Sequence, residues 1–173
     1  MKKILAISGS TRRSSSNEVV LNYIKTHLAA TVDFEIFDGI DKLPHFNPDL
    51  DNDGLPAIVQ TFRDKIQAAD GIIICSPEYV FSLPGSLKNA IEWNVSTTLF
   101  SNKPVALIVA SASGQKAFEA LDLIMTTLDA DLQPSTKLII PGIKGKINKA
   151  REIEDVETRE NILHVVQSLL QSI

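Results

Sequence analysis

A polar segment near the N-terminus, residues 9–17, has the residue types that bind phosphate. It holds several hydroxyl side chains and two arginines, and it lies between a continuous apolar run and the first helical pattern. Backbone N–H groups at a helix N-terminus favour an anion, and Arg12 or Arg13 could add a charge-assisted hydrogen bond. A serine-capped turn has the same composition, so this segment alone leaves phosphate binding and a purely structural turn both open.

Other chemistry at this position is excluded by inspection. The segment lacks the Gly-Lys-Ser/Thr of a Walker A loop and has only Gly9 of the three glycines in a dinucleotide fingerprint. Ala6 stands where a nucleophile elbow centred on Ser8 needs glycine. A low-molecular-weight phosphatase loop needs a cysteine here, whereas the one cysteine is Cys75. The histidines lie in different elements without metal-ligand spacing, so no metal site is predicted.

Two further polar segments follow apolar runs. Residues 76–83 include Pro77, Glu78 and Tyr79, and residues 111–115 are rich in small polar residues. An extended turn led by Pro77 can present backbone N–H and C=O groups to a ligand. In contrast, the basic residues 144–151 are interpreted as a solvated loop, and Cys75 as a small core residue.

The elements that position these segments alternate along the chain. Continuous apolar runs at residues 4–7, 72–75 and 105–109 are typical of strands covered on both faces, and residues 137–140 form a last predicted strand. Residues 32–36 alternate apolar with polar, as in an edge strand, and helical patterns separate all five runs. The predicted fold class is therefore α/β: a flavodoxin-like three-layer α/β/α sandwich with a five-stranded parallel sheet in the order 2-1-3-4-5.

This fold class also predicts where a ligand binds. Ligands of such sheets lie beyond the carboxyl ends of the strands, where the strand order reverses. The three polar segments follow the first, third and fourth predicted strands. They are therefore expected to form one binding crevice.

Length and charge limit the remaining possibilities. The chain has 173 residues with 44% apolar residues, which predicts one domain over residues 1–173. Its net charge of -4 disfavours nucleic acid or an anionic membrane as a partner. The single cysteine allows no internal disulfide, and no run is long enough for a signal peptide core or a membrane span. We therefore expect a cytoplasmic location.

The first and second segments together resemble the NADPH-dependent FMN reductase family. That family combines Gly-Ser-x-Arg-x-x-Ser-x-Asn with Pro-Glu-Tyr-Asn and then Pro-Gly-x-Leu-Lys-Asn-Ala-Ile-Asp-Trp. The resemblance covers nearly the whole chain in length and element order. The matching residues are Gly9, Ser10, Arg12, Ser15, Asn17, Pro77, Glu78, Tyr79, Pro84, Gly85, Leu87, Lys88, Asn89, Ala90, Ile91 and Trp93.

The resemblance implies FMN as cofactor and NADPH or NADH as cosubstrate. It places Ser10, Arg12, Ser15 and Asn17 at the phosphate. It also implies that the loop from Pro77 to Tyr79 wraps the flat isoalloxazine ring, which needs an apolar surface and a few aimed polar groups. The flavin would pass a hydride from the nicotinamide to a quinone, flavin, azo compound or metal oxyanion, so no catalytic side chain is predicted. It also implies a homodimer or homotetramer. The full set of expected cofactor-binding residues is Ser10, Arg12, Ser15, Ser16, Asn17, Pro77, Glu78, Tyr79, Val80, Ser82, Ser111, Ser113 and Gly114.

Two departures from the family pattern keep alternatives open. Val80 replaces the usual asparagine, and the third segment is shorter than the Gly-Gly-rich stretch of the family. One alternative is a flavodoxin-like electron carrier, although the first segment lacks the Thr/Ser-x-Thr-Gly-x-Thr pattern of flavodoxins. The other is a non-catalytic nucleotide-binding regulatory domain on the same fold.

Overall fold

A parallel five-stranded sheet with the strand order β2-β1-β3-β4-β5 forms the centre of the chain. The computed structural model describes residues 1–28 and 31–173. The strand order and the parallel pairing confirm the predicted fold class. The strands are β1 (Lys2–Ser8), β2 (Val32–Phe37), β3 (Gly71–Ser76), β4 (Val105–Ser111) and β5 (Lys137–Pro141). The helices are α1 (Ser16–Leu28), α2 (Ala57–Ala68), α3 (Gly85–Glu92), α4 (Gln115–Thr127) and α5 (Val156–Gln171), with short 3-10 turns at Pro48–Leu50, Pro134–Thr136 and Ile143–Lys146.

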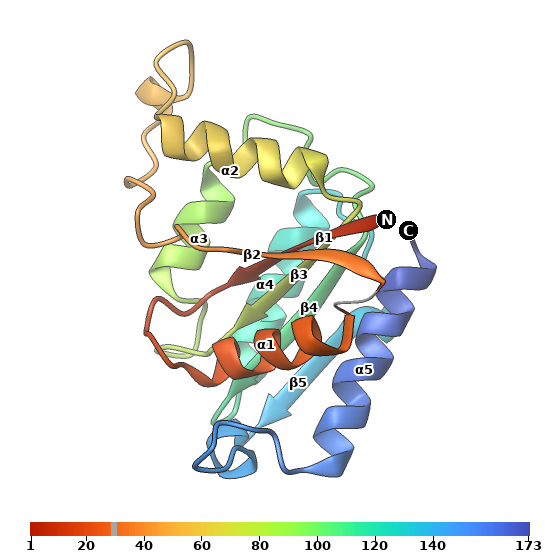
Figure 1. The fold of residues 1–173 in the computed structure, drawn as a ribbon. Helices are drawn as coiled ribbons and strands as arrows, with labels where there is room; N and C mark the ends of the chain where they lie inside the picture. The colour runs from red at the N-terminus through yellow and green to blue at the C-terminus, as the bar shows by residue number, and fades with distance from the viewer. Residues whose placement is uncertain (29–30) are drawn as a thin grey trace.

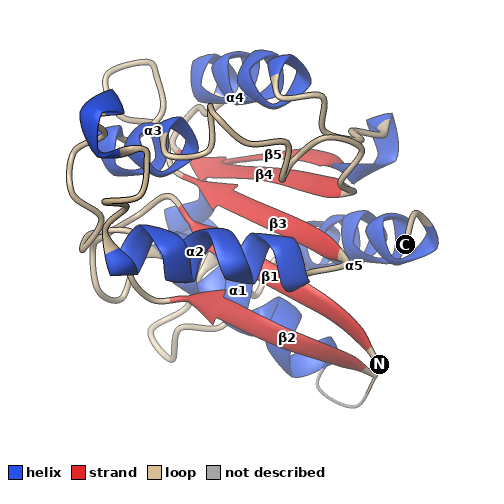
Figure 2. Cartoon of the chain, turned by 90° about the horizontal axis from the view of Figure 1, so that it is seen from above, coloured by secondary structure: helices blue, strands red, loops and turns tan. Residues whose placement is uncertain are grey.

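The helices divide between the two faces of the sheet (Figures 1 and 2). Helices α2, α3 and α4 cover one face in an apolar cluster that includes Phe62 and Leu107. Helices α1 and α5 cover the other face in a second cluster that includes Ile24 and Ile108. Alternate side chains of each central strand enter the two clusters, which is why these strands read as continuous apolar runs.

The register of the strands aligns their carboxyl ends. Ser8 of β1 lies opposite Cys75 of β3, and Ser111 of β4 lies opposite Pro141 of β5. The loops that follow β1, β3, β4 and β5 therefore leave the sheet along one edge. Strand β2 lies at the border of the sheet with alternating burial, as its sequence pattern predicts.

Local signals in the sequence set the starts of the two helices on the α1–α5 face. The backbone N–H of Glu18 donates to Ser15 Oγ at 3.1 Å, as expected for a capping serine. The Glu18 carboxylate accepts from the N–H of Ser14, one residue further back than a capping box predicts. Asp155 caps α5 by accepting from the N–H of Thr158 at 2.9 Å.

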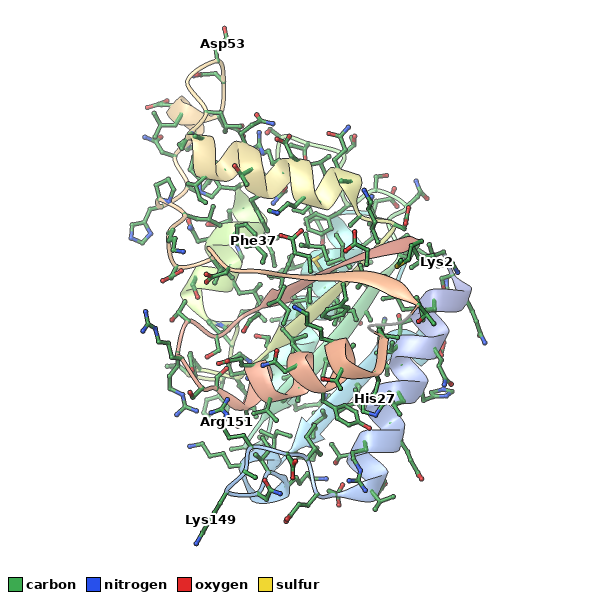
Figure 3. All side chains as sticks on the ribbon, viewed as in Figure 1. Lys2, His27, Phe37, Asp53, Lys149 and Arg151 are labelled. Atoms are coloured by element: carbon green, nitrogen blue, oxygen red, sulfur yellow. The ribbon has the colours of Figure 1, made fainter. Side chains whose placement is uncertain are left out.

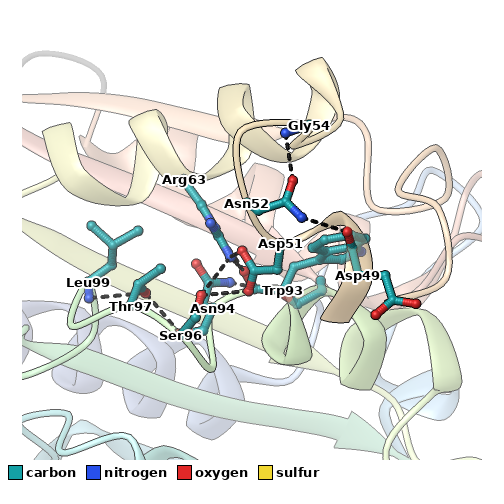
Figure 4. Close-up of polar contacts among 11 residues, drawn as sticks. Asp49, Asp51, Asn52, Gly54, Arg63, Trp93, Asn94, Ser96, Thr97 and Leu99 are labelled. Atoms are coloured by element: carbon teal, nitrogen blue, oxygen red, sulfur yellow. Dashed lines mark hydrogen bonds and ion pairs between the residues drawn. The ribbon is translucent and has the colours of Figure 1, made fainter. Parts of the chain in front are cut away.

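An ion pair whose side chains are largely shielded from solvent holds the long connection between β2 and α2 in place (Figure 4). Asp51 in this connection accepts hydrogen bonds from Arg63 Nη2 at 2.8 Å and from Ser96 Oγ at 2.6 Å. The Arg63 guanidinium also donates to the carbonyl of Trp93, just after α3. The connection is thereby tied to both α2 and the end of α3.

The sequence contains no run long enough to span a membrane, and the helices of the structure can be checked for the same property. Among the described residues, no helix combines the length and the apolar character needed to cross a bilayer.

Candidate functional site

A cavity of about 450 Å³ opens at the carboxyl edge of the sheet. It lies between the first turn of α1 and the loops that follow β3, β4 and β5. Its volume is in the range of small-molecule and cofactor sites. The residues that line it are Ser10, Arg12, Ser15, Ser16, Asn17, Pro77, Glu78, Tyr79, Ala110, Ser111, Ala112, Gly142, Ile143, Lys144 and Gly145.

The loop after β1 is shaped by its own serines. Ser10 donates its N–H to Ser8 Oγ at 3.2 Å, and Ser10 Oγ accepts from the N–H of Arg12 at 3.3 Å. Ser10 and Ser15 are buried, whereas Arg12 is exposed. The arginine side chain thus stays at the open side of the cavity and does not enter the core.

The first turn of α1 leaves consecutive donors unpaired. Among the described residues, no acceptor pairs with the backbone N–H groups of Ser15, Ser16 and Asn17. The first N–H groups of any α-helix lack partners within the helix, and the helix dipole makes this end positive. All three residues line the cavity, and donors of this kind suit an anion such as a phosphate.

The side chain of Asn17 has a structural role that the sequence did not reveal. Its Nδ2 donates to the carbonyl of Ala110 at 3.3 Å, and its Oδ1 accepts from the thiol of Cys75 at 3.1 Å. The asparagine therefore fastens the first turn of α1 to the ends of β3 and β4. Its side chain points to the strands, so the backbone N–H is the group of Asn17 available to a ligand.

Gly9 brings the first loop against the end of β3. A Cβ at this position would lie 2.7 Å from Ser76 Oγ and 3.1 Å from the Cα of Ser76. The N–H of Gly9 also donates to the carbonyl of Cys75 at 2.8 Å. Only a residue without a side chain permits this approach, which places the first loop beside the loop that begins at Pro77.

Glu78 links the loop after β3 to β4 and α4. Its backbone N–H donates to Ser111 Oγ at 3.1 Å. Its carboxylate accepts from the N–H groups of Lys116 at 2.9 Å and Ala117 at 3.0 Å. The carboxylate therefore caps α4, and Pro77 and Tyr79 are held at the cavity wall on either side of Glu78.

Not every expected residue reaches the cavity. Ser10, Arg12, Ser15, Ser16, Asn17, Pro77, Glu78, Tyr79 and Ser111 line it, whereas Val80, Ser82, Ser113 and Gly114 do not. Val80 lies at the tip of a tight turn, and Ser82 pairs with Tyr79 across that turn. Gly114 is packed against Val109 and Ile139 at the start of α4.

The loop after β5 was missed as part of the site. Gly142, Ile143, Lys144 and Gly145 form one wall of the cavity, and Lys144 is exposed there. The sequence offered a usable signal, because this loop also leaves the carboxyl edge and contains two glycines. Its basic composition had pointed instead to a solvated loop.

Arg151 is exposed, as expected for a solvated loop, but it also makes contacts that the sequence did not predict. Its Nη1 donates to the carbonyl of Ser14 at 3.0 Å, and its guanidinium lies 4.0 Å from the Glu18 carboxylate. Figure 3 shows Arg151 beside the first turn of α1, at the opposite end of that helix from His27. This basic side chain thereby connects the segment after β5 to the loop that precedes α1.

The cavity fits FMN in its chemistry. The unpaired N–H groups of the first turn, the hydroxyls of Ser10 and Ser15 and the guanidinium of Arg12 suit a phosphate monoester. Pro77 and Tyr79 offer the apolar surface that a flat ring needs.

Comparisons with known proteins agree with this chemistry. The chain matches the NADPH-dependent FMN reductase family over residues 2–143. It is 33% identical over 172 residues to an NAD(P)H-dependent FMN reductase of Pseudomonas aeruginosa, covering 96% of this chain and 92% of that protein. It is 28% identical over 167 residues to a quinone reductase of Escherichia coli, covering 92% of this chain and 89% of that protein.

A solved structure supports the fold. FerB, a flavoenzyme NAD(P)H:(acceptor) oxidoreductase from Paracoccus denitrificans, superposes with a TM-score of 0.86 at 24% identity, covering 99% of this chain and 96% of that one. This superposition confirms the predicted flavodoxin-like fold. The family match and the Pseudomonas aeruginosa relative confirm the FMN cofactor and the class of NAD(P)H-dependent oxidoreductase. The chain belongs to the NADPH-dependent FMN reductase family.

Proposed function

We propose that this protein is an NAD(P)H-dependent reductase that holds FMN in the cavity at the carboxyl edge and reduces a small-molecule acceptor. The observation that carries the proposal is the set of unpaired N–H groups at Ser15, Ser16 and Asn17, which faces the same cavity as the ring-binding surface of Pro77 and Tyr79. A phosphate and a flat ring joined by a flexible chain match this pairing of sites.

The first loop and α1 would bind the phosphate. Backbone N–H groups supply fixed donors, and Arg12 adds a charge at the solvent side. The loop after β3 would hold the ring, because the contacts of Glu78 to Ser111 and to α4 fix its backbone. Bound FMN would supply the redox chemistry, taking a hydride from NAD(P)H and passing two electrons to the acceptor.

The cavity contains little that could act as a side-chain acid or base. Of the residues that line it, Glu78 is the one with a carboxylate, and its Oε2 is occupied as the cap of α4. Lys144 supplies a cation among the lining residues. This composition supports a mechanism in which the cofactor performs the chemistry and the protein binds and orients.

The test compares FMN with riboflavin, which lacks the phosphate, by titration of the purified protein and flavin fluorescence. Wild type should bind FMN more tightly than riboflavin. Arg12→Ala should weaken FMN binding roughly tenfold, the effect of losing one charge-assisted hydrogen bond. Its riboflavin affinity should stay unchanged.

Arg13→Ala is the matched control, because Arg13 is equally exposed but does not line this cavity. Equal binding of FMN and riboflavin by wild type would contradict the phosphate site. The catalytic part is tested by NADPH and NADH oxidation in the presence of a quinone. An electron carrier would bind FMN and show no such turnover.

The assembly and the acceptor are proposed on the family resemblance alone. We propose a homodimer or homotetramer, with a quinone, free flavin, azo compound or metal oxyanion as the acceptor. Light scattering at micromolar concentration measures the assembly, and a monomer would contradict it.

A further inference from the structure

Residues 144–152, which we name the strap, lie at the rim of the cavity. The flanking residues are anchored, because Ile143 and Ile153 are only 2% and 3% exposed and pack in the cluster under α1 and α5. Every residue of the strap between them is exposed or half-buried. A segment with so few buried apolar contacts opens at a lower free energy than the core does.

The strap connects two of the loops that form the cavity. At its beginning, Lys144 and Gly145 are themselves lining residues. Near its end, Arg151 Nη1 donates to the carbonyl of Ser14 at 3.0 Å. Ser14 immediately precedes Ser15, which also lines the cavity. The position of the strap relative to the first loop therefore determines how far this rim is closed.

Arg151, Ser14 and Glu18 form one closed set of contacts. The Glu18 Oε2 atom accepts from the N–H of Ser14 at 2.7 Å and lies 4.0 Å from the Arg151 guanidinium. The side chains of Arg151 and Glu18 are 41% and 46% exposed, so this ion pair contributes little by itself. The charge-assisted hydrogen bond from Arg151 to the Ser14 carbonyl is therefore the stronger of the two attachments.

Both residues joined by this hydrogen bond have an unfavourable backbone. The φ angle is 64° for Arg151 and 59° for Ser14. Residues other than glycine rarely adopt positive φ, and such conformations persist where surrounding contacts hold them, as at ligand clamps and switches. Without the hydrogen bond, both residues could relax, which favours release of the strap from the first loop.

The strap is also the part of the cavity wall that moves at the lowest cost. The loop after β3 is fixed by the contacts of Glu78 to Ser111 and to α4. The first turn of α1 is fixed by the buried side chain of Asn17. Cofactor sites cover most of the surface of their ligand, so a ligand enters and leaves when part of the wall moves away.

We propose that the strap is a gate for FMN and that the hydrogen bond from Arg151 to Ser14 keeps this gate closed. The inference rests on the FMN site of the proposed function and adds control over the rate of cofactor exchange. Loss of the hydrogen bond raises the population of the open strap in the free and the FMN-bound protein alike. Association and dissociation then accelerate by the same factor, and the affinity does not change.

The experiment measures the two rates for FMN by stopped-flow flavin fluorescence, with association after mixing and dissociation after dilution of the loaded protein. In Arg151→Ala both rates should rise roughly tenfold, the effect of losing one hydrogen bond from a charged donor that water partly replaces. The equilibrium dissociation constant should stay within about twofold of the wild-type value. Riboflavin should show the same acceleration, because the strap acts on the whole ligand and not on the phosphate.

Lys149→Ala is the matched control. Lys149 is an equally exposed basic residue of the same strap, and its side chain is directed away from α1 in Figure 3. This variant loses the same type of charge without loss of the contact to Ser14. Both rates should therefore equal those of the wild type.

Hydrogen exchange of backbone N–H groups gives a second readout that needs no flavin. Within the strap, the N–H of Asn148 donates to the carbonyl of Glu152 at 2.9 Å, and the N–H of Arg151 donates to the carbonyl of Asn148 at 3.0 Å. In Arg151→Ala, peptides that cover the strap should exchange faster than in wild type. Peptides from α5 should exchange as in wild type, which shows that the fold is intact.

Three results would overturn the proposal. Unchanged FMN rates in Arg151→Ala would reject the gate and leave the FMN site standing. Weaker FMN binding with unchanged riboflavin rates would show that Arg151 belongs to the phosphate site and does not act through the strap. Wild-type protein that binds no FMN would reject the proposed cofactor site and this inference together.

Discussion

The carboxylate of Glu78 accepts a hydrogen bond from the backbone N–H of Lys116 at 2.9 Å, which joins the loop after β3 to the first turn of α4. The same oxygen accepts from the N–H of Ala117 at 3.0 Å. A residue that the family pattern places at the flavin therefore has its side chain turned to a helix end. It contributes to the site by fixing the backbone between Pro77 and Tyr79.

This contact predicts a coupled loss of stability and of FMN affinity. Glu78→Ala should lower the free energy of unfolding by about 1 kcal/mol, the usual effect of removing a helix cap. It should also weaken FMN binding, because the loop loses its attachment. Glu78→Gln keeps a side-chain oxygen and should retain most of the stability and most of the FMN affinity. Urea unfolding and flavin titration measure the two effects, and FMN affinity unaffected by Glu78→Ala would contradict the positioning role.

The close approach of the first loop to β3 predicts a strict requirement for glycine. Gly9→Ala should destabilise the fold by about 1 to 3 kcal/mol, since the new Cβ meets Ser76 at 2.7 Å. It should weaken FMN binding by shifting the loop. Gly85→Ala is the control, because a Cβ at Gly85 meets no atom within 4 Å and alanine favours a helix. In thermal unfolding, Gly9→Ala should have a clearly lower Tm than Gly85→Ala. Equal Tm values for the two variants would argue against the steric explanation.

The shielded Asp51–Arg63 pair predicts how the fold responds to acid. Burial raises the pKa of Asp51, but hydrogen bonds from Ser96 and Arg63 and the charge of Arg63 outweigh it, so the pKa lies below its usual value. A carboxyl whose pKa is lowered by folding contributes its full stabilisation above its pKa in the unfolded chain, which is about 3.9. That contribution is lost as the pH falls through the folded pKa. In Asp51→Asn, the free energy of unfolding measured with urea should therefore fall less steeply than in wild type between about pH 5 and pH 3.

Arg63→Met tests the same pair at neutral pH. It should lower the free energy of unfolding by about 2 kcal/mol, because Asp51 is left buried without its charged partner. The side chains of Asp51 and Arg63 are 8% and 12% exposed, so water replaces the lost contact poorly. Exposed pairs such as Lys42 with Asp38 serve as the comparison, and Lys42→Met should change stability by less than about 1 kcal/mol.

The buried thiol predicts the response to base. Burial raises the pKa of Cys75 far above its usual value. A group whose pKa is raised on folding stabilises the fold below its unfolded pKa of about 8.5 and loses this contribution as the pH rises further. Stability should therefore fall above about pH 8.5, and Cys75→Ala should reduce that slope. The native thiol should not react with a disulfide reagent until the protein unfolds; rapid reaction of native protein would contradict its burial.

The sequence by itself determined the architecture. The continuous apolar runs at β1, β3 and β4 and the alternating pattern at β2 follow directly from how many faces of each strand are covered. It also located the first turn of α1 and the segment from Pro77 to Tyr79, because capping and turn residues act over short distances. Family membership followed from the same local motifs.

Only the tertiary structure decided what the individual side chains do. It turned Asn17 to the ends of β3 and β4, engaged the Glu78 carboxylate at α4 and brought Lys144 to the wall of the cavity. Each of these contacts joins residues that are far apart in the chain, and their partners are set by strand order and register. A pattern read along one segment carries no information about the element that will face it, so these roles appear only when the sheet has formed.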